Sequence, residues 1–116
     1  MTAANWYGAR MIPLKIDHKI KDKEKTFQVG MGNLTAYHCP GHSPGSVVYF
    51  TQIDSNRVLF GQDVHGPLEA SFLSNRENYI HSLKFMLGLD ADILCEGHFG
   101  IYQGKEKVSR FIRSYL

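Results

Sequence analysis

Apolar and polar residues alternate with the two-residue period of a β-strand through the first half of the chain. A short apolar run near residue 94 adds one buried strand, so the predicted strands are 11–17, 26–29, 34–39, 47–53, 57–60 and 93–95. Turn-forming residues at 30–33 and 54–56 predict two hairpins. Pro13 has no backbone N–H to donate, which places the first strand at an edge of the sheet.

The apolar spacing becomes helical in the second half of the chain. Ser74 and Glu77 form a capping-box pattern that predicts Ser74 as the N-cap of a helix ending at Gly88. The apolar face of this helix comprises Tyr79, Ile80, Leu83, Met86 and Leu87. A second amphipathic helix begins at Lys105, with an apolar face of Val108, Phe111, Ile112, Tyr115 and Leu116. Strands followed by helices predict an α+β fold, with a mainly antiparallel sheet and helices on one face.

Length and composition are those of a single globular domain spanning residues 1–116. Hydrophobic residues make up 43% of the chain and charged residues 21%, which argues against disorder and against a membrane protein. No apolar run approaches transmembrane length, and the N-terminus lacks the basic and apolar regions of a secretory signal. The large side chains of Trp6 and Tyr7 need burial, which predicts that the first segment packs against another surface.

Net charge and cysteine usage indicate which partners and which cellular compartment to expect. The formal net charge of +2 is too small to indicate binding to nucleic acid, and the lysines near residue 20 are dispersed along a polar connection. Two cysteines without a secretory signal predict a reducing compartment and no disulfide framework. We therefore expect a cytoplasmic protein that binds neither nucleic acid nor membranes.

Three turns each follow an apolar run, and each presents one potential metal ligand. His42 lies in a Pro-Gly-His-Ser-Pro-Gly turn, Asp63 follows Gly-Gln, and His98 follows Glu-Gly. Proline and glycine stop the strands at these points, so the ligands are carried by loops between rigid elements. We expect the three side chains to converge on one ion. Imidazole and carboxylate donors suit zinc best, and iron or manganese also fit them.

The remaining histidines receive structural interpretations. We expect His38 to be a strand residue with a satisfied side chain. His65 follows Asp63 by two residues and could face the same cavity, but a loop residue is the favoured interpretation. His18 lies in the polar connection and His81 in the first helix, where neither indicates a ligand. The two serines beside the first turn are expected to stabilise it through hydrogen bonds.

A second metal hypothesis uses the cysteines. Cys39-x-x-His42 and Cys95-x-x-His98 are two Cys-x-x-His pairs that could form a structural Cys2His2 zinc site. Each cysteine falls at the end of an apolar strand, where a small buried thiol is common. This hypothesis also gives no purpose to the turn that carries Asp63, and it ranks second.

Segments 39–46, 59–63 and 95–98 resemble the last three metal-binding motifs of the metallo-β-lactamase superfamily, in the family's order. The glyoxalase II-like branch is the most similar, and the resemblance is tight over residues 33–100. It implies that His42 matches the third histidine on the first metal, that Asp63 matches the carboxylate bridging two metals, and that His98 matches the histidine on the second. It also implies metal-dependent hydrolysis of an ester, thioester, amide or phosphodiester in a small-molecule substrate.

The superfamily's first motif, His-x-His-x-Asp-His, is absent from this sequence. The resemblance therefore implies the C-terminal half of an αβ/βα sandwich, present as a fragment. We expect this half to bind at most one metal ion per protomer, weakly, and to be inactive alone. Half a sandwich leaves an apolar sheet face bare, which predicts a homodimer or pairing with the missing N-terminal half. A non-catalytic interaction module is the alternative function.

Overall fold

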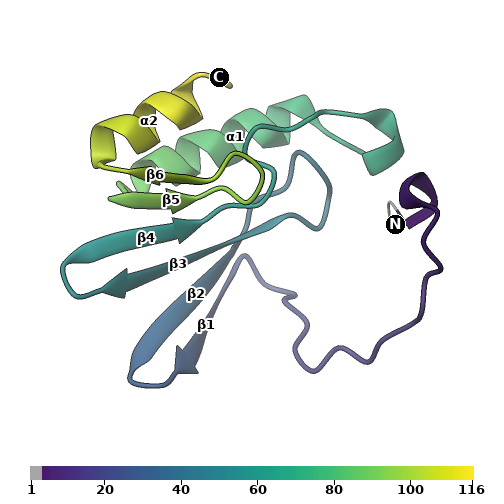
Figure 1. The fold of residues 1–116 in the computed structure, drawn as a ribbon, viewed down its shortest axis with the longest axis horizontal. Coiled ribbons are helices and arrows are strands. Elements are labelled where there is room, and N and C mark those ends of the chain that lie inside the picture. Colours follow the sequence, from purple (N-terminus) through teal and green to yellow (C-terminus); the bar gives the residue numbers. More distant parts are fainter. Residues whose placement is uncertain (1–3) are drawn as a thin grey trace.

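The structure is a computed structural model that describes residues 4–116 (Figure 1). Six strands form one sheet in sequence order: β1 (Glu24–Val29), β2 (Gly32–His38), β3 (Val47–Ile53), β4 (Asn56–Phe60), β5 (Ile93–Cys95) and β6 (Ile101–Gln103). The helical elements are the 3-10 turns η1 (Ala4–Tyr7) and η2 (Ala70–Phe72) and the α-helices α1 (Arg76–Gly88) and α2 (Lys105–Arg113).

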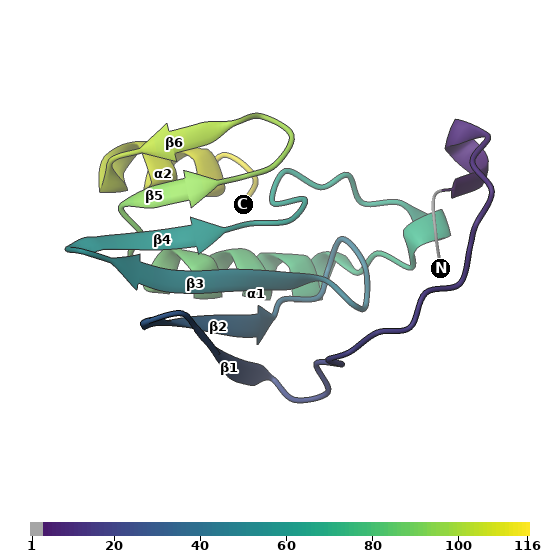
Figure 2. The same cartoon turned by 60° about the horizontal axis from the view of Figure 1, so that its bottom comes forward.

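The sheet is antiparallel except where β4 and β5 run parallel. Helix α1 makes the crossover between these two strands, as a parallel pair requires. Figures 1 and 2 show α1 and α2 side by side over the same face of the sheet. The α+β class, the mainly antiparallel sheet and the placement of the helices on one face are therefore confirmed.

The strand register assigns side chains to the helix-covered face. Phe50 pairs with Leu59, and Leu59 pairs with Leu94, so the three side chains form one row across β3, β4 and β5. Leu59 and Leu94 are fully buried. Leu83 of α1 and Ile112 of α2 belong to the same hydrophobic cluster. The core thus lies between this face and the two helices.

The neighbouring row of side chains lies on the opposite face of the sheet. Tyr49 pairs with Phe60, Phe60 with Cys95, and Cys95 with Ile101. Phe60 is 39% exposed and Ile101 is 65% exposed. Part of this face forms a shallow groove of about 660 Å³, lined by residues that include Leu34, Tyr49 and Phe60. We call this surface the uncovered face, because no element of residues 4–116 packs over it (Figure 1).

The prediction of a strand at 11–17 is wrong. This segment has no regular structure and is exposed along its length, with Leu14 83% exposed. A strand needs a partner for its backbone groups, and the edge strand β1 pairs only with β2 within the described sheet. The predicted packing of the first segment is confirmed only for Trp6, whose ring lies 4.9 Å from the Phe72 ring between centroids, although Trp6 is still 60% exposed and Tyr7 is 82% exposed.

Several element boundaries differ from the sequence prediction. The N-cap of α1 is Asn75, whose Oδ1 accepts a hydrogen bond from the N–H of Asn78 at 2.9 Å. Ser74, the predicted N-cap, instead donates its hydroxyl to the carbonyl of His42 and accepts from the N–H of Glu69. Strand β6 was not predicted, since its three residues are too few to show a period. Helix α2 ends before the predicted apolar positions 115 and 116.

Among residues 4–116, neither helix combines the length and the hydropathy that a membrane crossing requires.

Candidate metal centre

His42 lies in the connection between β2 and β3, which is packed tightly against α1. The N–H of Asn75 donates to the carbonyl of Gly41 at 2.8 Å, which joins this connection to the start of α1. Gly41 has a φ of 148°, and a Cβ there would lie 2.3 Å from the Tyr79 Cα. Ser43 and Ser46 hydrogen-bond through their hydroxyls at 2.9 Å, which confirms that they stabilise the turn. The backbone that carries His42 is therefore fixed.

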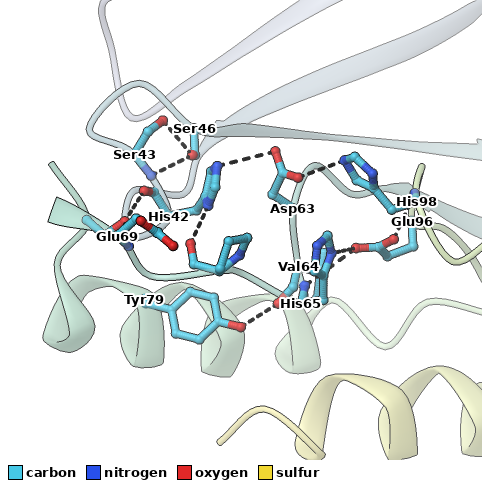
Figure 3. Close-up of polar contacts among 12 residues, drawn as sticks. His42, Ser43, Ser46, Asp63, Val64, His65, Glu69, Tyr79, Glu96 and His98 are labelled. Carbon is cyan, nitrogen blue, oxygen red and sulfur yellow. Dashed lines mark hydrogen bonds and ion pairs between the residues drawn. The ribbon is translucent and has the colours of Figure 1, made fainter. Parts of the chain in front are cut away.

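The imidazole of His42 is oriented by its own hydrogen bond. Its Nδ1 lies 2.7 Å from the carbonyl oxygen of Pro67, which can only accept, so Nδ1 carries the proton. In the neutral ring, the lone pair is then on Nε2, which lies 3.5 Å from Oδ2 of Asp63 (Figure 3). The ring also packs against Phe72, tilted by 46° at a centroid distance of 5.0 Å. This arrangement presents Nε2 to the site as a metal ligand requires.

Asp63 lies between the two candidate histidines. It has a φ of 49°, a left-handed conformation that is uncommon for a residue other than glycine. The N–H of Gly61 donates to the carbonyl of Cys95 at 2.9 Å and joins this turn to the end of β5. A non-glycine residue held in this region is often found at functional sites, because the surrounding structure must enforce it.

His98 comes from the loop between β5 and β6, and it reaches Asp63 from the other side. Its Nε2 lies 2.9 Å from Oδ1 of Asp63, so each carboxylate oxygen faces one imidazole (Figure 3). The His98 side chain is 64% exposed, whereas that of His42 is 14% exposed. The structure thus brings the three predicted ligands together, although their role as ligands remains a prediction.

The present arrangement is one of close histidine–carboxylate contacts rather than of a preformed metal cage. Among residues 4–116, no group of three or more His, Cys, Asp or Glu side chains has the geometry to hold a metal ion. Asp63 contacts the two histidines through different oxygens, so a shared ion would need side-chain rotation. The donor chemistry itself fits a divalent ion, since two imidazoles and one carboxylate are a common ligand set.

Glu96 was missed by the sequence interpretation, whereas its partner His65 was expected to be a loop residue that could face the same cavity, and it does lie in a loop. Glu96 is fully buried, and its Oε1 lies 2.6 Å from Nδ1 of His65. Its Oε2 accepts from the N–H groups of His98 at 3.0 Å and Phe99 at 2.9 Å. The available signal was an acidic residue placed directly after the apolar run 93–95, where burial is expected.

Burial alone would raise the pKa of the Glu96 carboxyl. Hydrogen bonds from His65 and from the N–H groups of Phe99 and His98 outweigh that effect, so the pKa lies below its ordinary value. Glu96 is therefore an ionised carboxylate at neutral pH. Its buried oxygens are stabilised by hydrogen bonds from His65, His98 and Phe99.

The other histidines have the structural roles expected of them. His38 ends β2, and its Nε2 donates to the carbonyl of Pro44 at 2.7 Å, which confirms that its side chain is satisfied. His81 is exposed on α1, and His18 lies against the Phe27 ring. None of these three contacts Asp63 in the described part of the chain.

The cysteines do not favour the Cys2His2 alternative. Cys39 and Cys95 are both free, and Cys39 belongs to the hydrophobic core. Burial raises the pKa of the Cys39 thiol to about 11, against a smaller lowering by a hydrogen bond with Ser82. Zinc needs the thiolate, so this environment opposes ligation. A Cys2His2 site would also leave out Asp63, whose carboxylate contacts both His42 and His98.

Comparison with known proteins relates this geometry to a known fold. Neither a protein-family profile nor a curated protein matches the sequence. Solved structures do match. BLEG-1 B3 metallo-β-lactamase is 24% identical, with a TM-score of 0.73 over 97% of this chain and 56% of that one. A metallo-β-lactamase superfamily protein from the archaeon Sulfolobus tokodaii is 16% identical, with a TM-score of 0.67 over 97% and 46%.

The metallo-β-lactamase Rm3 is a third similar structure, 18% identical, with a TM-score of 0.65 over 94% of this chain and 52% of that one. The chain therefore has the fold of part of a metallo-β-lactamase domain, as the sequence resemblance implied. It spans about half the length of the solved structures that it matches.

Proposed function

We propose that this chain supplies one half of the active site of a metal-dependent hydrolase of the metallo-β-lactamase superfamily. The observation that carries the proposal is the position of Asp63, whose two carboxylate oxygens face Nε2 of His42 and Nε2 of His98. Three turns that are distant in sequence meet at this point. The fold that the chain shares with metallo-β-lactamases supports the same conclusion.

The proposed ligands would hold a divalent ion, zinc first, with iron or manganese as alternatives. His42 and His98 would each donate a lone pair from Nε2, and Asp63 would supply a carboxylate oxygen to the same ion. When bound, such an ion lowers the pKa of water to near 7 and polarises a carbonyl or phosphoryl oxygen. The proposed substrates are small molecules with an ester, thioester, amide or phosphodiester bond.

Metal binding is tested directly on the chain. Zn²⁺ is titrated against a competing chelator, and the d–d spectrum of bound Co²⁺ reports the ligand geometry. We expect at most one ion per protomer, with affinity lowered at least tenfold by Asp63→Asn and by His42→Ala. The matched control is His81→Ala, which removes an exposed imidazole from α1. Equal affinity in all four proteins would overturn the proposed ligand set.

Catalysis is proposed to need the rest of the site. The chain lacks His-x-His-x-Asp-His, so we expect little hydrolysis of thioester or phosphodiester substrates by the chain alone. Co-expression with a polypeptide carrying that motif on the complementary half of the fold should restore both metal content and activity. High turnover by the isolated chain would contradict the expectation of inactivity.

We propose that the uncovered face of the sheet is occupied by that complementary half. The face carries exposed apolar side chains such as Ile53 and Phe60, and the chain spans about half of the structures it matches. Contiguous exposed apolar surface of this kind usually marks an interface. Light scattering on the pure chain tests the assignment, because a homodimer through this face would make a second copy the occupant. Ile53→Lys should weaken pairing, and Leu14→Lys, on the irregular N-terminal segment, is the control.

The alternative of a non-catalytic interaction module rests on the same uncovered face. It would be favoured by pairing that persists in a protein with no measurable affinity for Zn²⁺ or Co²⁺. A cytoplasmic location is proposed on a separate observation, namely that Cys39 and Cys95 are both free thiols.

A further inference from the structure

The loop between β5 and β6 is built around a buried carboxylate. Glu96 is fully buried and follows β5 directly. Its own N–H donates to the carbonyl of Gly100 at 3.0 Å, which closes the loop at its base. The side chain then turns beneath the loop, so that the backbone of His98 and Phe99 lies over the carboxylate oxygens.

Every contact of this carboxylate is with a hydrogen-bond donor. Oε2 accepts the N–H groups of His98 and Phe99, at 3.0 and 2.9 Å. Oε1 accepts Nδ1–H of His65 at 2.6 Å and, more weakly, the N–H of His65 at 3.4 Å. Charge-assisted hydrogen bonds of this kind are shorter and stronger than those between neutral groups. Glu96 therefore joins the turn that follows β4 to the loop that follows β5.

His98 depends on this support more than His42 does. The His42 ring is held directly, through Nδ1 and the carbonyl of Pro67. The His98 ring is largely exposed, and its one polar partner within residues 4–116 is Asp63. Gly97 and Gly100 both have positive φ values, of 97° and 98°, so the loop has little intrinsic preference for its shape. Apart from the Glu96–Gly100 bond at the base of the loop, the two hydrogen bonds to the Glu96 carboxylate hold the backbone that carries His98.

Glu96 also orients a second imidazole at the site. Because the carboxylate accepts from Nδ1, the neutral His65 ring carries its lone pair on Nε2. The His65 ring lies edge-on to the His98 ring at a centroid distance of 5.1 Å, and edge-on to Phe99 at 4.8 Å. Figure 3 shows His65 below Asp63, with Glu96 beside the His65 ring and below His98. The carboxylate thus sets the tautomer of a ring that packs on a proposed ligand.

We propose that Glu96 is the positioning residue of the metal site: its buried carboxylate holds the His98 loop and the His65 ring where His98 can share an ion with Asp63 and His42. This inference rests on the proposed function. Groups that orient metal ligands through hydrogen bonds, without contacting the ion, commonly contribute between about tenfold and a hundredfold to metal affinity. Glu96 touches neither the ion nor the substrate in this scheme.

The substitution Glu96→Gln isolates the role of the carboxylate. Glutamine has the same shape, but one oxygen is replaced by an NH2 group, which cannot accept a hydrogen bond. Either the N–H groups of His98 and Phe99 lose their acceptor, or Nδ1 of His65 must give up its proton and accept one instead. Glu77→Gln makes the same chemical change at an exposed position on α1 and serves as the matched control.

The first measurement needs no metal. Hydrogen exchange in the wild-type chain should show protected amides at His98 and Phe99 in an otherwise exposed loop, and imidazole ¹⁵N shifts should report His65 as the Nδ1–H tautomer. In Glu96→Gln, protection at these amides should fall at least tenfold or the His65 tautomer should change, while core amides such as Leu59 and Leu94 stay protected. Unprotected His98 and Phe99 amides in the wild-type chain would overturn the proposal, even if the variant did not fold.

The second measurement is affinity for Zn²⁺. We expect Glu96→Gln to lose between about tenfold and a hundredfold in affinity, and Glu77→Gln to match the wild type. Unchanged affinity in folded Glu96→Gln would overturn the positioning role while leaving the ligand set intact. If the wild-type chain binds no Zn²⁺, the proposed function fails, and the exchange data alone decide whether Glu96 holds the loop.

Discussion

The two faces of the sheet differ in what they contribute to this protein. The face beneath α1 and α2 carries fully buried side chains such as Leu59 and Leu94. The uncovered face, one residue along the same strands, carries Phe60 and Ile101, which are partly or largely exposed. Successive side chains of a strand point to opposite faces of the sheet, so the same strands supply both faces. Apolar character along a strand therefore does not reveal which face is buried within this chain and which remains exposed.

The two faces also contribute differently to the stability of the isolated chain. Burial against the helices holds the β-strands and the site turns together, since the His42 turn packs on α1 through Gly41. The uncovered face adds little to the stability of the isolated chain, because its side chains remain in water. The following substitutions test this difference, beginning with the largest expected effect.

Leu94→Ala should be the most destabilising of these changes. Leu94 is fully buried beneath the helices, and truncation of such a leucine usually costs about 3 kcal/mol through lost burial and a cavity. Ile101→Ala, on the uncovered face, should cost less than about 1 kcal/mol. Urea denaturation followed by circular dichroism measures both. Similar losses from the two substitutions would show that the uncovered face is already covered in solution.

The two cysteines lie on opposite faces, and their reactivity should differ accordingly. Cys39 is in the core, with its pKa raised from 9.0 to about 11, so its thiolate fraction at pH 8 falls about a hundredfold. Cys95 lies in the row of side chains on the uncovered face and is only partly buried.

Mass spectrometry after iodoacetamide treatment measures this difference. We expect Cys95 to be modified first, and modification of Cys39 to speed up about tenfold per pH unit below its pKa, because only the thiolate reacts. Equal rates at pH 8 would contradict burial of Cys39. The single variants Cys39→Ser and Cys95→Ser assign each rate to its residue.

Gly41→Ala tests the contact between the His42 turn and the helix-covered side. The added Cβ would lie 2.3 Å from the Tyr79 Cα, which is backbone and cannot rotate away. We expect a loss of about 2 kcal/mol from overpacking, together with weaker Zn²⁺ binding through displacement of His42. Gly45→Ala, in the same turn, has open space around the new Cβ and serves as the control. Equal stability of the two variants would contradict the tight packing of this turn.

Asn75→Ala should be less destabilising than Leu94→Ala and Gly41→Ala. It removes the side-chain acceptor for the N–H of Asn78 at the start of α1, and loss of an N-cap typically costs about 1 kcal/mol. Thermal unfolding measures the change. A larger loss from Ser74→Ala would be attributed to its bonds with Glu69 and His42, since Ser74 is not the cap in this structure.

Much of the fold could be predicted because its signals are local. The hairpin of β3 and β4, with its turn after Ile53, follows from alternation and turn-forming residues close in sequence. The failures occurred where local pattern is insufficient. The alternating segment at 11–17 has no partner in the described sheet, and β6 is too short to show a period. Pairing depends on another strand, which a segment's own residues do not encode.

The sequence by itself determined the types of residue in the three turns and the places where the strands stop, since proline, glycine and the neighbouring apolar runs act over a few residues. Only the tertiary structure decided that Asp63 lies between His42 and His98, and that buried Glu96 pairs with His65 across 31 positions of the chain. Those contacts arise because β4 and β5 lie side by side with α1 crossing between them. Donors and acceptors that meet through such a crossover leave no periodic signal in the sequence.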